Sequence, residues 1–353
     1  MVEPAPERHR GSHVFNLAML AIGAAALLWT LHRLGWDDLR AGVARVGSAF
    51  AVVLALDLAA LLLDARALHT FMRPEARMLS YWQVVAAQIS GRAVNVVTPL
   101  SALGEATKFT MLVTRAPRVR VASAIVLFDL AGLYFSVLVM LIGTPITLLL
   151  VDLPRPFEIT IAIGLAVVIA LVVAIGIVVQ RGASATLTAL LYRIRIISAE
   201  RRDDWRARLR ELDRHLTELH ANRSAGTWRG GLWLIASRLV TWTSTMLLIR
   251  AVGVAITPAL VLGVLSIGVL IQWIASAVPF GLGIADGGYY ALFGLLGASG
   301  THGAVVTMLN RARSLSIAAV GFVAMAIVHA MNRVALARIH TKLREHRARV
   351  AAD

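Results

Sequence analysis

Residues 91–112 constrain the fold more than any other segment, because they suit a membrane but cannot cross one as a single helix. The segment reads GRAVNVVTPLSALGEATKFTML, and its apolar run is interrupted by Pro99 and Gly104. Polar or charged side chains also lie along it, namely Arg92, Asn95, Glu105 and Lys108. Non-helical backbone at membrane depth is tolerated only where protein packs on it or a wet cavity adjoins it. A charge near the bilayer centre costs at least about 2.5 kcal/mol. The segment therefore predicts a re-entrant hairpin beside a working site.

A second interrupted segment, residues 276–293, repeats this pattern later in the chain. It reads SAVPFGLGIADGGYYALF and contains Pro279, Gly281, Gly283 and Asp286. Paired interrupted segments in two halves of a chain point to a transport site near the bilayer midplane. We therefore expect an internal inverted repeat, in which the first hairpin enters from inside and the second from outside. Two alternatives stay open: residues 257–300 could make two full crossings, and the prolines could merely kink ordinary helices.

The composition decides the class of protein. Of the 353 residues, 58% are hydrophobic and 16% are charged, and the mean hydropathy is +0.74, which is typical of a polytopic membrane protein. The apolar runs predict an all-α integral membrane bundle of about seven or eight spans. The formal net charge of +15 arises from basic residues at the ends of these runs, so no nucleic-acid partner is predicted. The chain has no cysteine and no HExxH pattern, so neither a metal site nor a cofactor is expected.

Apolar runs and basic connections divide the chain into five parts. They are a polar tail at 1–13, a first membrane half at 14–180 with the interrupted region 82–114, a basic insertion at 181–229, a second membrane half at 230–331 with the interrupted region 265–299, and a basic tail at 332–353. The arginines place both termini and the insertion in the cytoplasm of a multi-pass protein of the cell (plasma or inner) membrane. The first run could be a signal peptide, but its length and the lack of a cleavage site favour an uncleaved helix.

The basic insertion carries apolar residues at helical spacing: Trp205, Leu209, Leu212, Leu216 and Leu219. This spacing predicts an amphipathic helix. The helix could pack as a solvated element on the inner rim of the bundle, or it could dock a partner.

Charges also lie inside the long spans. Asp57 is deep enough that it must face protein or water, whereas Asp64 is expected at the interface, paired with Arg66. In the last span, Arg311 and Arg313 are two residues apart on a helix and point about 160° from each other. At most one of these two arginines therefore needs to face a shared site.

These residues lead to one hypothesis for a lipid headgroup site. Arg92, Lys108 and Arg311 would neutralise a phosphate, while Glu105 and Asp286 would bind a cationic group or a coupling proton. Asn95 completes the substrate-binding set, and the residues expected to shape the cavity are Pro99, Gly104, Pro279, Gly281 and Gly283. The alternative is a set of internal salt bridges that lock the bundle. No catalytic residue is predicted.

The same residues resemble the transmembrane-region family of lysylphosphatidylglycerol synthases, also called flippase-like domain proteins. The first interrupted segment looks like the asparagine–proline–glycine–glutamate block of that family, in Asn95, Pro99, Gly104 and Glu105, and Lys108 stands at the usual basic position of that block. The second block looks like Pro279, Gly281, Gly283 and Asp286, although glutamate is commoner at the last position. Arg311, followed by Gly321, is similar to the arginine of the family's last helix. The resemblance covers about residues 14–331.

The resemblance implies a flippase-like transporter, which moves a phospholipid or polyprenyl-type lipid between leaflets. In full-length synthases a soluble carboxy-terminal domain transfers the aminoacyl group. Because the chain stops about twenty residues after the last span, that domain and its enzyme activity are not expected here. Membrane lipids are the expected ligands, and the oligomeric state is left open.

Two other functions remain as alternatives. One is a non-transporting scaffold or accessory subunit for a lipid-modifying enzyme or glycosyltransferase, with the insertion as its docking surface. The other is a membrane-embedded transferase, for which Glu105 is the only obvious base.

Overall fold

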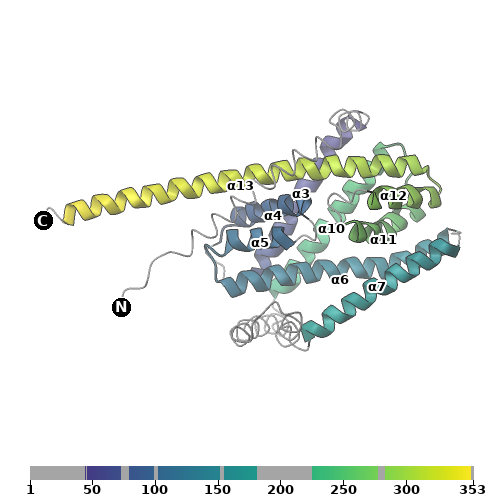
Figure 1. Ribbon diagram of the computed structural model, residues 1–353, viewed down its shortest axis with the longest axis horizontal. Coiled ribbons are helices and arrows are strands. Elements are labelled where there is room, and N and C mark those ends of the chain that lie inside the picture. The colour runs from purple at the N-terminus through teal and green to yellow at the C-terminus, as the bar shows by residue number, and fades with distance from the viewer. Residues whose placement is uncertain are drawn as a thin grey trace.

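The computed structural model describes residues 46–72, 79–98, 102–151, 155–180, 225–276 and 283–350, together with Ala44. The first predicted span, most of the basic insertion, Pro99, Pro279 and Gly281 lie outside the described residues. Every regular element in the described part of the chain is an α-helix (Figure 1). These helices are α3 (Ser48–Met72), α4 (Tyr81–Val97), α5 (Ala102–Leu112), α6 (Arg118–Leu150), α7 (Arg155–Gln180), α10 (Ala225–Ala251), α11 (Pro258–Ala275), α12 (Ile284–Leu295) and α13 (Gly300–Val350).

Six of the described helices are long and apolar enough to cross a membrane. Their spans are Ser48–Met72, Arg118–Leu150, Arg155–Ala174, Gly226–Ala251, Pro258–Ala275 and Gly300–Met331. At 1.5 Å per residue, the shortest of them reaches about 27 Å, close to the thickness of the hydrocarbon core. The predicted all-α polytopic bundle is therefore confirmed.

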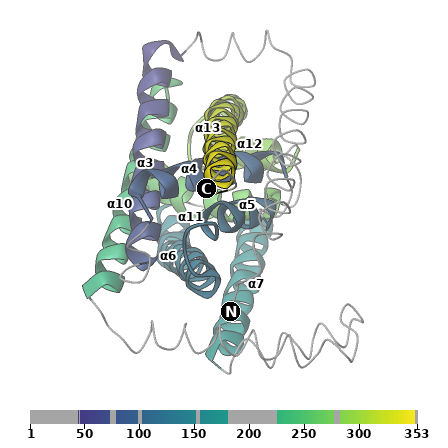
Figure 2. The ribbon, with the colours of Figure 1, turned by 90° about the vertical axis from the view of Figure 1, so that its left-hand side faces the viewer.

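Helices α3 and α10 form an antiparallel pair at one side of the bundle (Figure 2). Two serines of α10 hold the pair together: the Ser237 hydroxyl donates to the Ala60 carbonyl at 3.0 Å, and the Ser244 hydroxyl donates to the Val53 carbonyl at 3.2 Å. Small residues with such bonds let membrane helices approach closely. At the end of α3, Arg120 Nε of α6 donates to the Met72 carbonyl at 3.3 Å. We call this end of the bundle the Met72 end, and the opposite end, where α6 finishes, the Leu150 end.

Helices α4 and α5 form a hairpin that opens at the Met72 end. Leu79, which precedes α4, and Leu112, which ends α5, belong to one buried cluster with Met72. The two helices touch closely near the turn, since a Cβ on Gly104 would collide with the Gly91 carbonyl and the Asn95 side chain. With 17 and 11 residues, they reach about 25 and 17 Å, too short for either to cross a bilayer alone. This is the re-entrant arrangement that the interrupted sequence predicts.

Helices α11 and α12 form a second hairpin, which opens at the Leu150 end. Ser266 of α11 packs against Gly143 in the second half of α6, and Ile271 of α11 packs against Gly288 of α12. Gly283 precedes α12 with φ of +80°, a conformation that glycine adopts without strain. Because the 12 residues of α12 reach only about 18 Å, the structure favours a helix plus a re-entrant return over two full crossings.

Helix α13 runs past both hairpins, with α11 and α12 under its first part and α4 and α5 under its middle (Figure 1). Near its start, Gly303 packs on the Tyr289 backbone of α12, and farther on Gly321 packs on Ile89 and Ala93 of α4. The ends of the two hairpins approach each other beside residues 307–314, where Val96 of α4 and Ala285 of α12 line one small cavity. The hairpins thus enter from opposite ends and meet along α13, as an inverted repeat would require.

Candidate functional site

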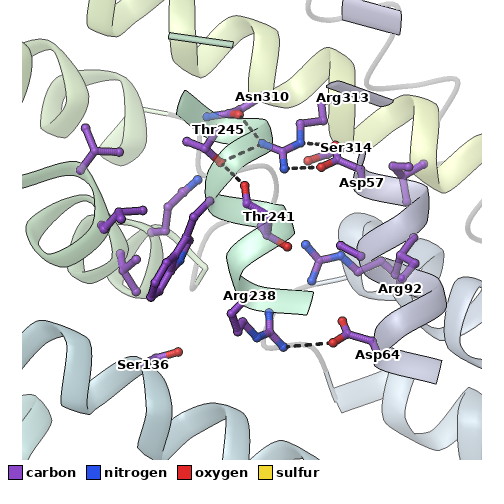
Figure 3. A pocket seen from close by; sticks show the side chains of 18 of the residues that line it. Asp57, Asp64, Arg92, Ser136, Arg238, Thr241, Thr245, Asn310, Arg313 and Ser314 are labelled. Atoms are coloured by element: carbon purple, nitrogen blue, oxygen red, sulfur yellow. Dashed lines mark hydrogen bonds and ion pairs between the residues drawn. The ribbon is translucent and has the colours of Figure 1, made fainter. Parts of the chain in front are cut away.

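A cavity of about 430 Å³ lies inside the bundle, among seven helices (Figure 3). Its charged lining residues are Asp57 and Asp64 of α3, Arg92 of α4, Arg238 of α10 and Arg313 of α13. Further polar and aromatic lining comes from Ser136, Thr241, Trp242, Thr245, Gln272, Trp273, Tyr289, Asn310 and Ser314. Arg238 stands near the middle of the Gly226–Ala251 span, which places the cavity close to mid-membrane depth. Its size is that of an ordinary small-ligand pocket.

One side of the cavity is built by a two-pronged ion pair between Arg313 and Asp57. Arg313 donates through Nε and Nη2 to the two carboxylate oxygens of Asp57, and the Ser244 hydroxyl adds a bond of 2.9 Å to the same carboxylate. The remaining Nη1 of Arg313 donates to Thr245 at 3.3 Å. Both charged side chains are largely buried, with 14% and 8% of their surface exposed. This network ties α3, α10 and α13 together.

A second ion pair lies on the other side, and it is looser. Arg238 Nη2 and Asp64 Oδ1 are 3.7 Å apart, which is beyond hydrogen-bond distance. Both Asp64 Oδ1 and Arg238 Nε are buried, and neither atom makes a hydrogen bond with the residues that the structure describes. The sequence-based expectation that Asp64 pairs with Arg66 at the interface is wrong: Asp64 is buried beside Arg238, and Arg66 lies over the Tyr81 ring.

Arg92 points into the space between these two ion pairs (Figure 3). Its side chain is exposed to the cavity. Within the described part of the chain, it makes neither a hydrogen bond nor an ion pair, and the nearby carboxylates of Asp57 and Asp64 are taken by other arginines. A guanidinium at membrane depth without a bonded partner is a site for an anion or for ordered water.

The first interrupted segment forms its own polar network. The Asn95 side chain accepts from the Gly104 amide at 2.8 Å and donates to Glu105 at 3.2 Å, so it caps the amino end of α5 from across the hairpin. Glu105 pairs with Lys108 at 2.6 Å, and Lys108 Nζ also lies 5.7 Å from the centre of the Phe128 ring. Asp129 of α6 lies near enough to act electrostatically on this pair. None of the three predicted residues Asn95, Glu105 and Lys108 lines the central cavity.

The second interrupted segment forms a comparable network with α13. Asp286 accepts from the Gly283 amide at 3.0 Å, from Thr307 at 2.9 Å and from Arg311 at 2.6 Å. The acid therefore caps its own helix and binds it to α13. Arg311 lines a smaller cavity of about 150 Å³, which adjoins the central one because both are lined by Val96, Gln272, Asn310 and Ser314.

The structure thus separates the six predicted binding residues into three places. Arg92 faces the central cavity, Asn95, Glu105 and Lys108 form the hairpin network, and Asp286 and Arg311 form the α13 network. The main cavity residue to which the sequence suggested no role is Arg238, whereas Arg313 is one of the two arginines that the sequence singled out in the last span. Arg238 carried a visible signal, since it is a charge in the middle of an apolar run.

The arrangement can hold a small anionic group at membrane depth, and its walls present both apolar and aromatic surface. In the described residues, no group of three or more His, Cys, Asp or Glu side chains is placed to hold a metal ion.

Comparison with curated proteins and with solved structures finds no match to this chain. The model of the family described as Lysylphosphatidylglycerol synthase TM region matches residues 16–349, almost the whole chain. The matched region is the membrane part of these synthases, not the catalytic one. The chain therefore belongs to the lysylphosphatidylglycerol synthase transmembrane-region family, and it is a multi-pass membrane protein of a lipid-related family.

Proposed function

We propose that this protein binds the headgroup of a phospholipid or polyprenyl-type lipid in the central cavity and moves it between leaflets. One observation carries the proposal: Arg92 points into a cavity at membrane depth and makes no hydrogen bond or ion pair with any residue that the structure describes. A charge in such a place is costly unless it meets water or a counter-ion, and residues that keep such a charge are usually functional. A lipid phosphate would supply the hydrogen-bonded counter-ion that Arg92 lacks among the described residues.

The two hairpins support the same proposal. They enter from opposite ends and meet beside residues 307–314, next to the cavity. Secondary transporters place their binding sites between interrupted helices near the midplane. In this proposal both termini are cytoplasmic, the protein is in the cell membrane, and Glu105, Lys108, Asp286 and Arg311 hold the hairpins in the positions that frame the cavity.

The test is lipid movement in proteoliposomes. The full-length protein is reconstituted with a headgroup-labelled phospholipid, and the fraction of label that a membrane-impermeant quencher reaches is followed with time. We expect the parental protein to move the label and Arg92→Gln to slow the movement at least tenfold. Arg250→Gln is the matched control, because Arg250 is exposed at the end of α10 and away from the cavity.

Two results would refute the proposal. One is no movement above that of empty liposomes by correctly folded parental protein, which would leave the scaffold role. The other is equal movement by the parental protein and Arg92→Gln, which would separate transport from the cavity.

A further inference from the structure

Helix α10 forms one wall of the central cavity, yet among the described helices it packs extensively only on α3. Across the cavity stand α6 and α11, which pack closely on each other: Ser266 Cβ lies 2.9 Å from the position that a Cβ on Gly143 would take. The boundary between α6 and α10 differs, because side chains bridge it. We call this boundary the α6–α10 seam, and its residues are Gly132, Phe135 and Ser136 of α6 and Arg238 and Trp242 of α10.

One aromatic stack bridges the middle of the seam. The rings of Phe135 and Trp242 have their centroids 5.6 Å apart and their planes 21° from parallel. Both residues stand near the middle of their spans, Arg118–Leu150 and Gly226–Ala251, so the stack lies close to mid-membrane depth. Because side chains alone form the stack, a change of rotamer separates the rings without moving either helix.

The stack stands between lipid-facing and cavity-facing surface on both helices, where successive residues are about 100° apart. On α6, Leu138 lies on one flank of the stacked phenyl ring and is 51% exposed, while Ser136 lies on the other flank and lines the cavity. On α10, Leu239 lies on one flank of the stacked indole and is also 51% exposed, while Arg238 lies on the other and lines the cavity. The two rings therefore separate the cavity from the outer surface of the bundle.

Polar groups lie directly behind the stack. Ser136 and Arg238 point into the same space (Figure 3). One turn before Ser136, Gly132 leaves room for the guanidinium, since Arg238 Nη2 lies 3.8 Å from the position that a Cβ would take. Asp129, on the same face of α6, is exposed and acts electrostatically on Arg238. Exposed charge at membrane depth is tolerated beside water or a polar ligand, so the seam offers a headgroup a polar path.

Three other walls of the cavity are closed more firmly. The serine hydrogen bonds join α3 to α10, the ion pair of Arg313 and Asp57 joins α3 to α13, and close packing joins α6 to α11. A cavity of about 430 Å³ has the size of a small-ligand pocket, so the acyl chains of a lipid bound there must stay in the bilayer. The lipid then has to pass through an opening in one wall.

We propose that the α6–α10 seam is the lateral portal through which a lipid headgroup enters the central cavity from the bilayer, and that the stack of Phe135 and Trp242 is its gate. The inference rests on the proposed function and adds the route to it. When the rings part, the headgroup passes to Ser136 and Arg238 while the acyl chains remain against Leu138 and Leu239.

A reactive lipid tests the route independently of transport. Single cysteines are placed in this cysteine-free chain, and the full-length protein is reconstituted in phosphatidylcholine vesicles that contain a phosphatidylethanolamine with a maleimide on its headgroup. Each labelling rate is divided by the rate of the same variant unfolded in SDS. Ser136→Cys should react at least fivefold faster than Val167→Cys, which lies at similar depth on the exposed face of α7.

Variants of the gate show whether the reactive lipid passes the stack. Adding Trp242→Ala to Ser136→Cys should raise the labelling rate at least threefold, whereas Trp242→Phe keeps a ring and should leave the rate within twofold. Trp228→Ala is the matched control, because Trp228 is exposed at the start of α10 and does not line the cavity. If Trp242→Ala does not fold, Phe135→Ala opens the same stack from α6.

A reversible lock tests the same gate through lipid movement. Phe135→Cys and Trp242→Cys are combined and joined by a short bifunctional thiol reagent that forms disulfides. Joining should slow movement of headgroup-labelled phospholipid at least tenfold, and reduction should restore it. Each single cysteine treated with the same reagent is the control and should keep at least half of its rate.

Two results would overturn the inference: an unchanged labelling rate of Ser136→Cys in folded gate variants, and undiminished lipid movement in the joined protein. The second result removes the portal and leaves transport. The failure of transport looks different, because gate-dependent labelling of Ser136→Cys in a protein that moves no lipid removes the proposed function and leaves the portal.

Discussion

The ion pair between Glu105 and Lys108 decides whether the first interrupted segment acts on the lipid or only holds its hairpin. Lys108 Nζ and Glu105 Oε2 are 2.6 Å apart, and the two side chains are 5% and 29% exposed. Glu105→Gln keeps the oxygen that accepts from Asn95 but removes the charge that balances Lys108. We expect this variant to be destabilised and to recover when Lys108→Met is added.

The magnitude follows from the geometry. Two unit charges 2.6 Å apart attract by about 6 kcal/mol at an effective dielectric constant of 20. Desolvation offsets part of this, and removing one member of a buried pair typically costs about 3–5 kcal/mol. Because Glu105 is partly exposed, we expect the lower value, about 3 kcal/mol. Lys108→Met keeps apolar contact with Phe128, so the double variant should lie within about 1 kcal/mol of the parental protein.

The assay is thermal unfolding of the detergent-solubilised protein, followed by size-exclusion fluorescence. At roughly 2 °C per kcal/mol for a chain of this length, Glu105→Gln should lower the midpoint by about 6 °C, with most of that loss restored in the double variant. Glu158→Gln at the start of α7 is the control, with an expected loss below about 1 kcal/mol. The reasoning is refuted if Glu105→Gln keeps the parental midpoint, stops lipid movement and is not rescued by Lys108→Met, because these residues would then act on the substrate.

Three further predictions follow from the packing. Asp57→Asn should destabilise the protein by about 3–5 kcal/mol, since it leaves Arg313 buried without its counter-charge, and Arg313→Gln should restore most of the folded yield; no recovery would contradict the pairing. Gly104→Ala should lower the free energy of unfolding by roughly 1–3 kcal/mol, and with it the folded yield, because the added Cβ collides with α4. Gly294→Ala, whose Cβ meets open space, should be neutral or slightly stabilising. In this cysteine-free chain, Thr241→Cys in the cavity should react with a small aqueous thiol reagent, and Val167→Cys on the exposed face of α7 should not; equal reaction rates would argue against a wet cavity.

The sequence predicts the fold well because its signals are local. Proline, glycine and charges in an apolar run mark where a membrane helix must stop, and α4 ends at Val97 while α12 begins at Ile284, beside the predicted breaks. The order of the two segments, one entered from each side, follows from counting the basic ends of the apolar runs. Counting the basic ends of the apolar runs does not distinguish two full crossings from a hairpin at residues 257–300, because the difference depends on how far α12 reaches along α13.

The site is less predictable because its contacts join distant parts of the chain. Asp57 and Arg313 are 256 residues apart, and nothing near either residue shows that they meet. Asp64 illustrates the same difficulty. Its neighbour in the sequence, Arg66, is the partner that the sequence suggests, but in the structure Arg66 lies over the Tyr81 ring and Asp64 lies beside Arg238 of α10. Arg92 was identified because a charge in an interrupted apolar segment is unusual by itself.

The two arginines of α13 also limit how this protein can move. Arg311 holds Asp286 of α12 and Arg313 holds Asp57 of α3, and residues two apart on a helix project about 160° from each other. Pulled from nearly opposite sides, α13 cannot turn about its own axis without breaking one of the two bridges. A rearrangement that shifts the α11–α12 hairpin against the α3–α10 pair must therefore either move α13 as a rigid body or break one of the two ion pairs. The arginine released from its ion pair would then face the cavity that it lines, the central cavity for Arg313 and the smaller one for Arg311.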